Sequence, residues 1–319
     1  MPGFIIKSLE EQSDMSKTIR IGTRESQLAV WQAETVAGLL KGNGYNAELI
    51  FIKSEGDTDL KTPLYEIGVQ GIFTKALDIA LLNGDIDIAV HSMKDVPTVM
   101  AKGIVQAAVL PRASYKDLLV PKKGAKFNDA MHPMVVATSS IRRKAQWLNR
   151  YPGDRLENLR GNVNTRLRKV EESDWAGAIF AAAGLERLGL RPENAIELDW
   201  MLPAPAQGAI IVVSKASDEY CLTACAQFHD RNTALCTAIE RDFLRALLGG
   251  CSTPISALAQ VIDGQVIFKG NILSKDGAQK KEVSKTVKVS EAGNLGAEAA
   301  AELLANGGQE ILNSIRNED

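Results

Sequence analysis

Residues 85–97, DIDIAVHSMKDVP, change half-way along from an alternating pattern to a polar one. Between residues 85 and 90 every second residue is apolar, which predicts a short β-strand. Polar side chains at the carboxyl end of a strand lie where α/β sheets bind ligands. A solvated turn between a strand and a loop is the alternative interpretation. The polar residues concerned, with the proline that ends the stretch, are His91, Ser92, Lys94, Asp95 and Pro97.

The segments before this strand alternate between strand and helix patterns. Apolar runs at 19–23 and 47–52 predict strands, while the segments from 27 to about 40 and from 73 to 82 predict helices. Glycines after the first of these helices indicate its end. The order strand, helix, strand, helix, strand is typical of a largely parallel sheet with helices on its faces.

A second α/β pattern follows residue 112. An apolar strand at 135–137 runs into the sequence TSSIRR, residues 138–143. Serine or threonine at a helix start is suited to capping, and the free amides and dipole of a helix N-terminus favour an anion. The two arginines in the first turn of this helix therefore predict an anion site.

Basic residues recur after the later strand patterns. Arg160 precedes a helix that bears Arg166, and the small-residue strand at 178–182 leads to Arg187. Arg168 and Arg191, by contrast, fit an ordinary solvated surface.

The chain is expected to divide into three domains. The apolar strand at 209–213 follows a proline-bearing linker and is predicted to return to the first sheet, so two crossings join two α/β domains. This predicts a hinged cleft of the periplasmic-binding-protein type, followed by a small α+β domain with strands split at Asp-Gly turns. The predicted ranges are 17–111 with 206–228, 112–205 and 229–319, after a tail at 1–16.

Composition limits the possible partners. The 319 residues carry a net charge of -2, which gives no reason to expect nucleic acid or an anionic membrane surface. The sequence has no apolar run of about 18 residues, and its first 17 residues have no secretory h-region. A cytoplasmic protein is expected. It is expected to be a monomer, because heptads and long apolar edges are absent from the sequence.

All four cysteines lie in the last third of the chain, and disulfides are not expected in a cytoplasmic protein of this size. A zinc site is poorly supported, because His229 is the one histidine near Cys221 and Cys225. No metal is therefore predicted. Cys221, Cys225 and Cys236 are predicted to be small buried apolar residues. The sequence around Cys251 does not decide whether this residue is a structural or a reactive cysteine.

Four motifs together resemble one enzyme family. HSMKDVP at 91–97 is preceded by GTRESQLA and followed by TSSIRR and GGCSTPI, in this order between residues 19 and 259. The combination is similar to the porphobilinogen deaminases, or hydroxymethylbilane synthases. The resemblance implies a transferase of tetrapyrrole and haem biosynthesis that joins four porphobilinogen molecules head to tail into hydroxymethylbilane, releasing ammonia each time. It also implies a dipyrromethane cofactor held on Cys251 by a thioether.

The resemblance further implies roles for single residues. Asp95 matches the catalytic aspartate, since a fixed carboxylate can stabilise a cationic intermediate and accept a proton. Each pyrrole brings an acetate and a propionate, and arginine pairs with carboxylates bidentately. The implied cofactor-binding residues are Cys251, Lys94, Ser92, Thr138, Ser139, Ser140, Arg142, Arg143, Arg166 and Asp57. The implied substrate-binding residues are Arg24, Ser26, Arg160, Arg187 and Gln207.

Some positions depart from the family pattern. Glu66 and Gln70 stand in a stretch that is commonly basic. Pro205 and Ala206 replace a more usual Val-Gly pair before Gln207, and Ser256 replaces a usual glycine. These departures concern loop contacts and not Asp95. The alternative function is a non-catalytic anion-binding protein with the same two-domain cleft, which would explain the arginines but neither GGC nor HSMKDVP.

Overall fold

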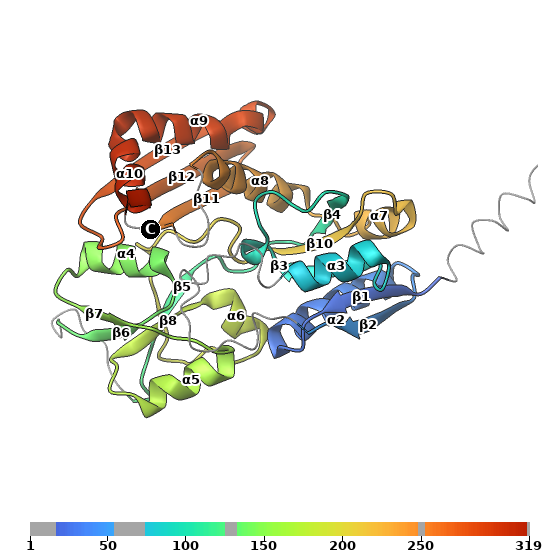
Figure 1. Cartoon of the computed structure of the whole chain (residues 1–319), viewed down its shortest axis with the longest axis horizontal. Helices are drawn as coiled ribbons and strands as arrows, with labels where there is room; N and C mark the ends of the chain where they lie inside the picture. The colour runs from blue at the N-terminus through green and yellow to red at the C-terminus, as the bar shows by residue number, and fades with distance from the viewer. Residues whose placement is uncertain (1–16, 54–73, 125–132, 248–252, 318–319) are drawn as a thin grey trace, which may run out of the picture. The chain divides into compact units, whose positions relative to one another are not determined.

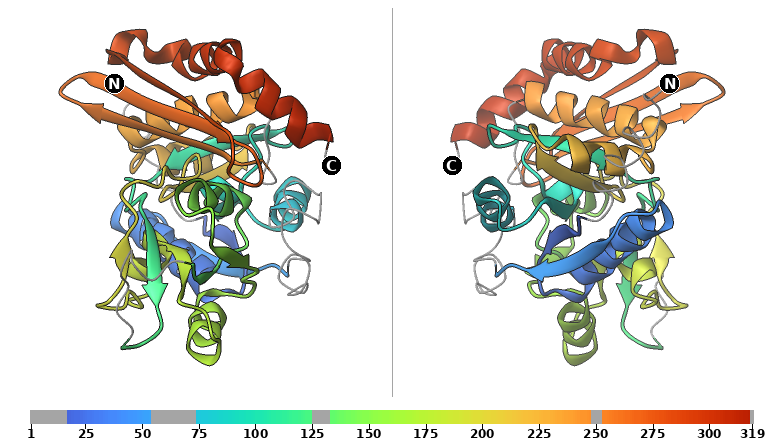
Figure 2. Two further views of the ribbon diagram at one scale, coloured as in Figure 1. Left: turned by 90° about the vertical axis from the view of Figure 1, so that its left-hand side faces the viewer. Right: turned by 90° about the vertical axis from the view of Figure 1, so that its right-hand side faces the viewer.

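The computed structural model describes residues 17–53, 74–124, 133–247 and 253–317 (Figures 1 and 2). The chain forms two compact units. Of the described residues, unit 1 comprises 17–53, 74–111 and Ile210–Ala234, and unit 2 comprises 112–124, 133–209, 235–247 and 253–317. Among the described residues, no helix is long and apolar enough to cross a membrane.

Unit 1 contains a five-stranded sheet in the order β2-β1-β3-β10-β4. β1 (Ile19–Thr23) pairs in parallel with β2 (Ala47–Phe51) and with β3 (Ile88–Ser92). β10 (Ile210–Lys215) pairs antiparallel with β3 and with β4 (Ile104–Val109). The sheet is therefore mixed, because the strand that returns from the later part of the chain enters it in the opposite direction.

Three helices pack on this sheet. α2 (Gln27–Gly42) is capped by Ser26, and α3 (Lys75–Asn83) ends at Gly84 in the left-handed conformation. α2 and α7 (Glu219–Ala226) bury small and aliphatic side chains against the strands, namely Ala33, Val36, Leu40, Cys221, Ala224 and Cys225.

The predicted burial of three cysteines is confirmed. Cys221, Cys225 and Cys236 are buried, free thiols. Burial raises the pKa of Cys225 to about 12, with the charge of Asp218 adding to the effect. A thiol with such a pKa is scarcely ionised at neutral pH, so Cys225 acts as an apolar packing residue.

The sheet of unit 2 has the order β7-β6-β8-β5-β9. β6 (Val135–Ala137) pairs in parallel with β7 (Arg155–Glu157) and with β8 (Gly177–Ala181). β5 (Asp117–Pro121) runs antiparallel to β8 and to β9 (Ile196–Glu197).

Helices of unit 2 bury aliphatic and aromatic side chains against this sheet. α4 (Ile141–Arg150) contributes the buried Trp147. α5 (Val163–Glu172) and α6 (Ala182–Arg187) contribute Val170 and Leu185 to a second cluster. The parallel strands place the starts of all three helices at the same edge of the sheet.

The C-terminal part of unit 2 is an antiparallel sheet covered by helices (Figure 2). Its strands are β11 (Ile255–Ile262), β12 (Gln265–Leu273) and β13 (Lys280–Lys288). Phe243 and Phe268 lie at the centre of the core between sheet and helices. The helical segments are α8 (Arg231–Ala246), η4 (Val289–Asn294), α9 (Leu295–Leu303), η5 (Leu304–Gly308) and α10 (Gln309–Asn317).

The predicted fold class is confirmed. Two α/β sheets are present, the chain passes between them twice, and a small α+β part follows. The strands predicted at 19–23, 47–52 and 135–137 agree with β1, β2 and β6. Strands β4, β5, β7 and β9 were not predicted, and the division into three domains stays a prediction.

Candidate active site

In unit 1 the predicted site residues follow two neighbouring strands. β1 and β3 are adjacent and parallel, so their carboxyl ends lie at the same edge of the sheet. Arg24 and Ser26 follow β1, and Ser92 ends β3. The 3₁₀ turn η2 (Met93–Asp95) comes next and carries Lys94 and Asp95, both half-buried. The structure therefore gathers these five residues at one edge.

Two serines at this edge have defined hydrogen bonds. The Ser26 hydroxyl accepts from the amide of Ala29 at 3.4 Å and so caps α2. The Ser92 hydroxyl accepts from Nε2 of Gln32 at 2.8 Å, and Gln32 is itself buried in α2. Helix α2 thus fixes both the start of its own first turn and the side chain at the end of β3.

The backbone around Asp95 is not extended. The 3₁₀ turn η2 ends the alternation of side chains that an extended strand would give Lys94 and Asp95. Among the described residues, no hydrogen bond or ion pair reaches the Asp95 carboxylate.

His91 lies next to this edge and is buried. Burial lowers its pKa to about 3, and the charge of Arg24 acts in the same direction, so the imidazole is neutral at physiological pH. Its Nε2 has no hydrogen-bond partner among the described residues. His91 lines a small cavity of about 20 Å³ together with Asp78, Val96 and Pro97.

In unit 2 the predicted residues follow three parallel strands. Thr138, Ser139 and Ser140 come after β6, Arg160 after β7, and Arg187 ends the helix after β8. The Ser140 hydroxyl accepts from the Arg143 amide and caps α4, as the sequence predicted.

Other side chains of this set are held by the backbone. The Ser139 hydroxyl accepts from the Leu159 amide at 2.9 Å. Nε of Arg166 donates to the Gly161 carbonyl at 2.7 Å, which keeps this arginine beside the start of α5. The guanidinium of Arg187 donates to the Gly208 carbonyl at 2.7 Å, and burial lowers the pKa of Arg187 to about 10, with Glu186 acting in the opposite direction.

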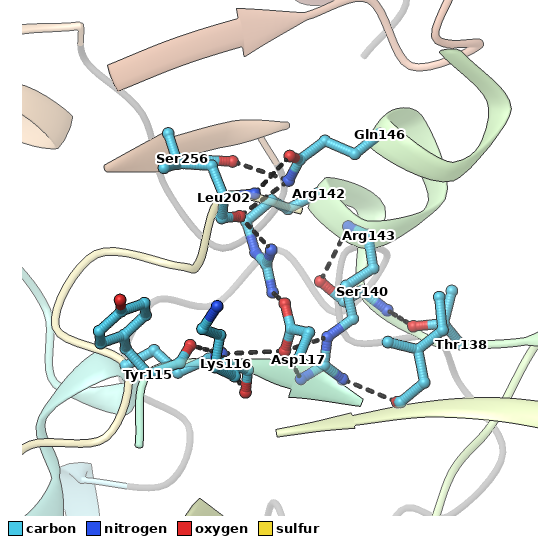
Figure 3. Close-up of polar contacts among 12 residues, drawn as sticks. Tyr115, Lys116, Asp117, Thr138, Ser140, Arg142, Arg143, Gln146, Leu202 and Ser256 are labelled. Carbon is cyan, nitrogen blue, oxygen red and sulfur yellow. Dashed lines mark hydrogen bonds and ion pairs between the residues drawn. The ribbon is translucent and has the colours of Figure 1, made fainter. Parts of the chain in front are cut away.

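Asp117, at the start of β5, lies between Arg142 and Arg143 (Figure 3). Its Oδ2 accepts from Arg142 at 2.7 Å, and its Oδ1 accepts from the Nε and a terminal nitrogen of Arg143 at 3.1 and 2.7 Å. Burial works to raise the pKa of Asp117, but the two guanidinium charges outweigh it and lower the pKa to about 2. Asp117 is therefore ionised at neutral pH. Sequence reasoning did not identify this residue.

Gln207 also binds Asp117. Its Nε2 donates to Oδ1 of Asp117 at 2.9 Å and to the Tyr115 carbonyl at 2.8 Å. Three residues that the sequence predicted for cofactor or substrate binding, Arg142, Arg143 and Gln207, thus meet at one carboxylate.

This cluster leaves two polar atoms without partners in the described part of the chain. They are Nε of Arg142, a donor, and Oε1 of Gln207, an acceptor. Arg142 otherwise donates to the Leu202 carbonyl at 2.7 Å. Buried polar atoms are usually paired, so a bound group or water is expected at such positions.

Comparisons with known proteins agree with one family throughout. Residues 19–223 match the model described as "Porphobilinogen deaminase, dipyromethane cofactor binding domain", and residues 234–305 match "Porphobilinogen deaminase, C-terminal domain". The chain belongs to the porphobilinogen deaminase family. The porphobilinogen deaminase of Syntrophotalea carbinolica is 40% identical over 304 residues, covering 94% of this chain and 96% of that protein.

Other members of the porphobilinogen deaminase family are similar to the same degree. The chloroplastic porphobilinogen deaminase of Pisum sativum is 40% identical and covers 96% of this chain and 87% of its own length. The probable porphobilinogen deaminase of Methanocaldococcus jannaschii is 47% identical over 243 residues, covering 76% of this chain and 82% of that protein. Among solved structures, the methionine-binding protein MetQ has 14% identity and a TM-score of 0.43, covering 68% of this chain and 92% of that one.

Two of the residues that the deaminase resemblance singles out, Asp57 and Cys251, lie outside the described residues, as do Glu66 and Gln70. Asp117 lies within them and could have been suspected from its sequence context. It opens the apolar run DLLVP, and a carboxylate at the start of a buried strand requires a cationic partner.

Proposed function

We propose that this protein joins four porphobilinogen molecules head to tail into hydroxymethylbilane and releases one ammonia for each. The observation that carries the proposal is the set of arginines in the segments that follow β6, β7 and β8, in a chain of net charge -2. Each pyrrole of the substrate and of the growing chain carries an acetate and a propionate. Several fixed guanidinium groups suit such a polyanion, because each can bind a carboxylate bidentately.

The same donor set fits a dipyrromethane cofactor. Its carboxylates need buried or half-buried cations, and Nε of Arg142 is a buried donor without a partner in the described part of the chain. When bound, the cofactor supplies the pyrrole carbon to which the first substrate is joined. We propose that Cys251 holds it covalently and that its polar contacts come from Asp57, Ser92, Lys94, Thr138, Ser139, Ser140, Arg142, Arg143 and Arg166.

Asp95 is proposed as the catalytic residue. The carbon–nitrogen bond of the substrate breaks as ammonia leaves, and positive charge develops on the methylene carbon and the pyrrole ring. A carboxylate free of ion pairs can stabilise that charge. After the new carbon–carbon bond has formed, the pyrrole carbon loses a proton, which the same carboxylate can accept.

Substrate binding is assigned to Arg24, Ser26, Arg160, Arg187 and Gln207. The buried Gln32 supports this assignment indirectly, since it orients the hydroxyl of Ser92 at the edge that also carries Arg24. We also propose that the protein acts as a monomer in the cytoplasm, and sedimentation equilibrium checks the monomer.

Intact-protein mass spectrometry tests the function. Protein purified from cells that make porphobilinogen should exceed its sequence mass by two linked pyrrole units, because a thioether survives denaturation. Peptide mapping should place the increment on Cys251. Added porphobilinogen should then produce further increments of one pyrrole each.

Cysteine variants provide the control for this experiment. Cys251→Ser should remove the mass increment, whereas Cys225→Ala, a change at a buried packing residue, should retain it. A bare sequence mass that does not change when porphobilinogen is added would overturn the proposal and favour a non-catalytic anion-binding protein.

A further inference from the structure

The carboxylate of Asp117 is bound by more side chains than the single partner of a simple ion pair. The residue is fully buried, and its two oxygens accept four hydrogen bonds from Arg142, Arg143 and Gln207. The two arginines are themselves 5% and 6% exposed. A single carboxylate thus organises three side chains that belong to two segments far apart in the sequence.

The charge balance of this cluster requires a carboxylate. Two buried guanidinium groups repel each other, and burial lowers the pKa of Arg142, with Arg143 adding to the effect and Asp117 opposing it. With Asp117 ionised, the three charged side chains carry one net positive charge. The cluster is then cationic enough to attract a carboxylate, while its internal repulsion is compensated.

The orientation of the arginines follows from the same contacts. Arg143 uses its Nε and one terminal nitrogen on Asp117 and donates from the other terminal nitrogen to the Ile179 carbonyl at 2.9 Å. Arg142 uses both terminal nitrogens, on Asp117 and on the Leu202 carbonyl, and its Nε has no hydrogen-bond partner among the described residues. The plane of each guanidinium is therefore set by Asp117 together with one backbone carbonyl.

We propose that Asp117 is a positioning residue, which holds Arg142, Arg143 and Gln207 in the arrangement that binds the carboxylates of the cofactor and of the growing pyrrole chain. The proposal rests on the proposed function. If Asp117 positions these groups, its replacement should weaken ligand binding in addition to lowering the stability of the fold. If its role were purely structural, its replacement would lower stability and leave ligand binding unchanged.

Asp154 offers a matched control. It is a buried aspartate of unit 2 that accepts from Nε1 of Trp147 at 2.7 Å and from the Met134 amide at 2.9 Å. Trp147 belongs to α4, the helix that also carries Arg142 and Arg143. Asp154→Asn therefore removes a buried carboxylate that supports the same helix through Trp147.

The test compares wild type, Asp117→Asn and Asp154→Asn as purified full-length proteins. Melting temperature, cofactor occupancy by intact mass, and KM and kcat for porphobilinogen are measured for each. Both variants should melt below wild type. Asp117→Asn alone should be purified mostly without the mass increment, and its loaded fraction should show a KM raised by about tenfold or more, as expected for misplaced binding groups.

Equal occupancy and KM in Asp117→Asn and wild type would overturn the inference. Should Asp117→Asn fail to fold, Asp117→Glu keeps the charge and displaces it by one methylene. Positioning predicts a raised KM for Asp117→Glu, whereas a role of charge alone predicts the KM of wild type. A wild-type protein without the mass increment would instead overturn the proposed function, so the two failures are distinguishable.

Discussion

Gln146 binds the backbone of Leu202 through both of its amide atoms. Its Oε1 accepts from the Leu202 amide at 2.9 Å, and its Nε2 donates to the Leu202 carbonyl at 2.9 Å and to the Ser256 hydroxyl at 3.0 Å (Figure 3). The carbonyl of Leu202 also accepts from Arg142. Helix α4, the segment before β10 and strand β11 are thus joined at one buried amide. The hydroxyl of Ser256 supplies part of this contact.

Replacing Gln146 by methionine should destabilise the protein. The side chain keeps nearly the same volume, but the amide of Leu202 and the buried hydroxyl of Ser256 lose a partner. A buried polar group left unpaired costs about 1–3 kcal/mol. The free energy of unfolding from urea titration measures the effect. Gln309→Met at an exposed position should change it by less than about 0.5 kcal/mol, and equal values for the two variants would contradict the prediction.

Removal of one partner from the Arg112–Glu240 ion pair should lower the free energy of unfolding by more than the Gln146→Met change does. Glu240 is fully buried and accepts from both terminal nitrogens of Arg112 and from the amides of Ala206 and Ala259. Arg112→Met leaves this carboxylate without its cation, a change that costs about 3–5 kcal/mol for a buried pair. Thermal and urea unfolding measure the loss. Arg168→Met, which removes an exposed partner of Glu172, provides the control and should cost less than about 1 kcal/mol.

Ala206 provides a test in the stabilising direction. Its φ angle is 62°, in the left-handed region that costs a residue with a Cβ about 1–2 kcal/mol. Ala206→Gly should remove this strain and stabilise the protein by up to about 1 kcal/mol. Ala301→Gly, on the exposed face of α9, should instead destabilise the protein by about 1 kcal/mol. A lower melting temperature for Ala206→Gly would contradict the strain argument.

Local patterns in the sequence predicted much of the fold. Each of these predictions depends on a pattern of only a few consecutive residues. They are the apolar runs of β1, β2 and β6 and the cap at Ser140, and all were confirmed. Arg142, Arg143 and Arg187 were identified in the same way, since each comes after a strand pattern, and Arg160 was identified because it precedes a helix pattern.

Contacts between distant residues could not be predicted. Asp117 is 25 positions from Arg142 and 90 from Gln207, so the fold alone brings them together. The conformation of the turn that carries Lys94 could not be predicted for a different reason. Pro97 indicates that the strand ends, but it does not determine whether Met93–Asp95 is extended or forms a 3₁₀ turn.

His91 should make stability depend on pH. Its pKa is about 3 in the folded protein and 6.5 in the unfolded chain, so the unfolded state binds more protons between these values. The contribution of His91 to stability is therefore complete above pH 6.5. As the pH falls below that value, the free energy of unfolding declines by up to about 1.4 kcal/mol for each pH unit. Asp117 has a folded pKa of about 2 and an ordinary value of 3.8, so its stabilising contribution is lost only as the pH falls below about 4.

Comparison with His91→Phe isolates this contribution. Phenylalanine carries no titratable proton, and His91 Nε2 has no partner in the described part of the chain. Unfolding free energies measured from pH 7 to pH 4.5 should fall more steeply for wild type than for His91→Phe. Parallel curves would mean that His91 is protonated in the folded protein too. Asp78, which lines the same cavity, is present in both proteins, and burial raises its pKa.

Replacing Asp95 by asparagine should abolish most turnover with little effect on the fold. The side chain is half-buried, and no hydrogen bond or ion pair reaches its carboxylate among the described residues, so the change breaks no contact there. The loss of a group that stabilises charge and accepts a proton should lower kcat by about 10²–10⁴-fold. Single-turnover kinetics on protein loaded with cofactor beforehand measures this loss. Asp95→Glu should retain a small part of the activity, because the carboxylate is kept but displaced.

Two controls separate this effect from misfolding or loss of cofactor. Glu34→Gln changes an exposed carboxylate on α2 and should leave kcat and the melting temperature unchanged. Intact mass should show that Asp95→Asn carries the same pyrrole increment as wild type before the reaction starts. A loaded Asp95→Asn protein that turns over porphobilinogen at the wild-type rate would exclude Asp95 as the catalytic residue. A protein that is unloaded but folded would instead assign Asp95 to cofactor attachment.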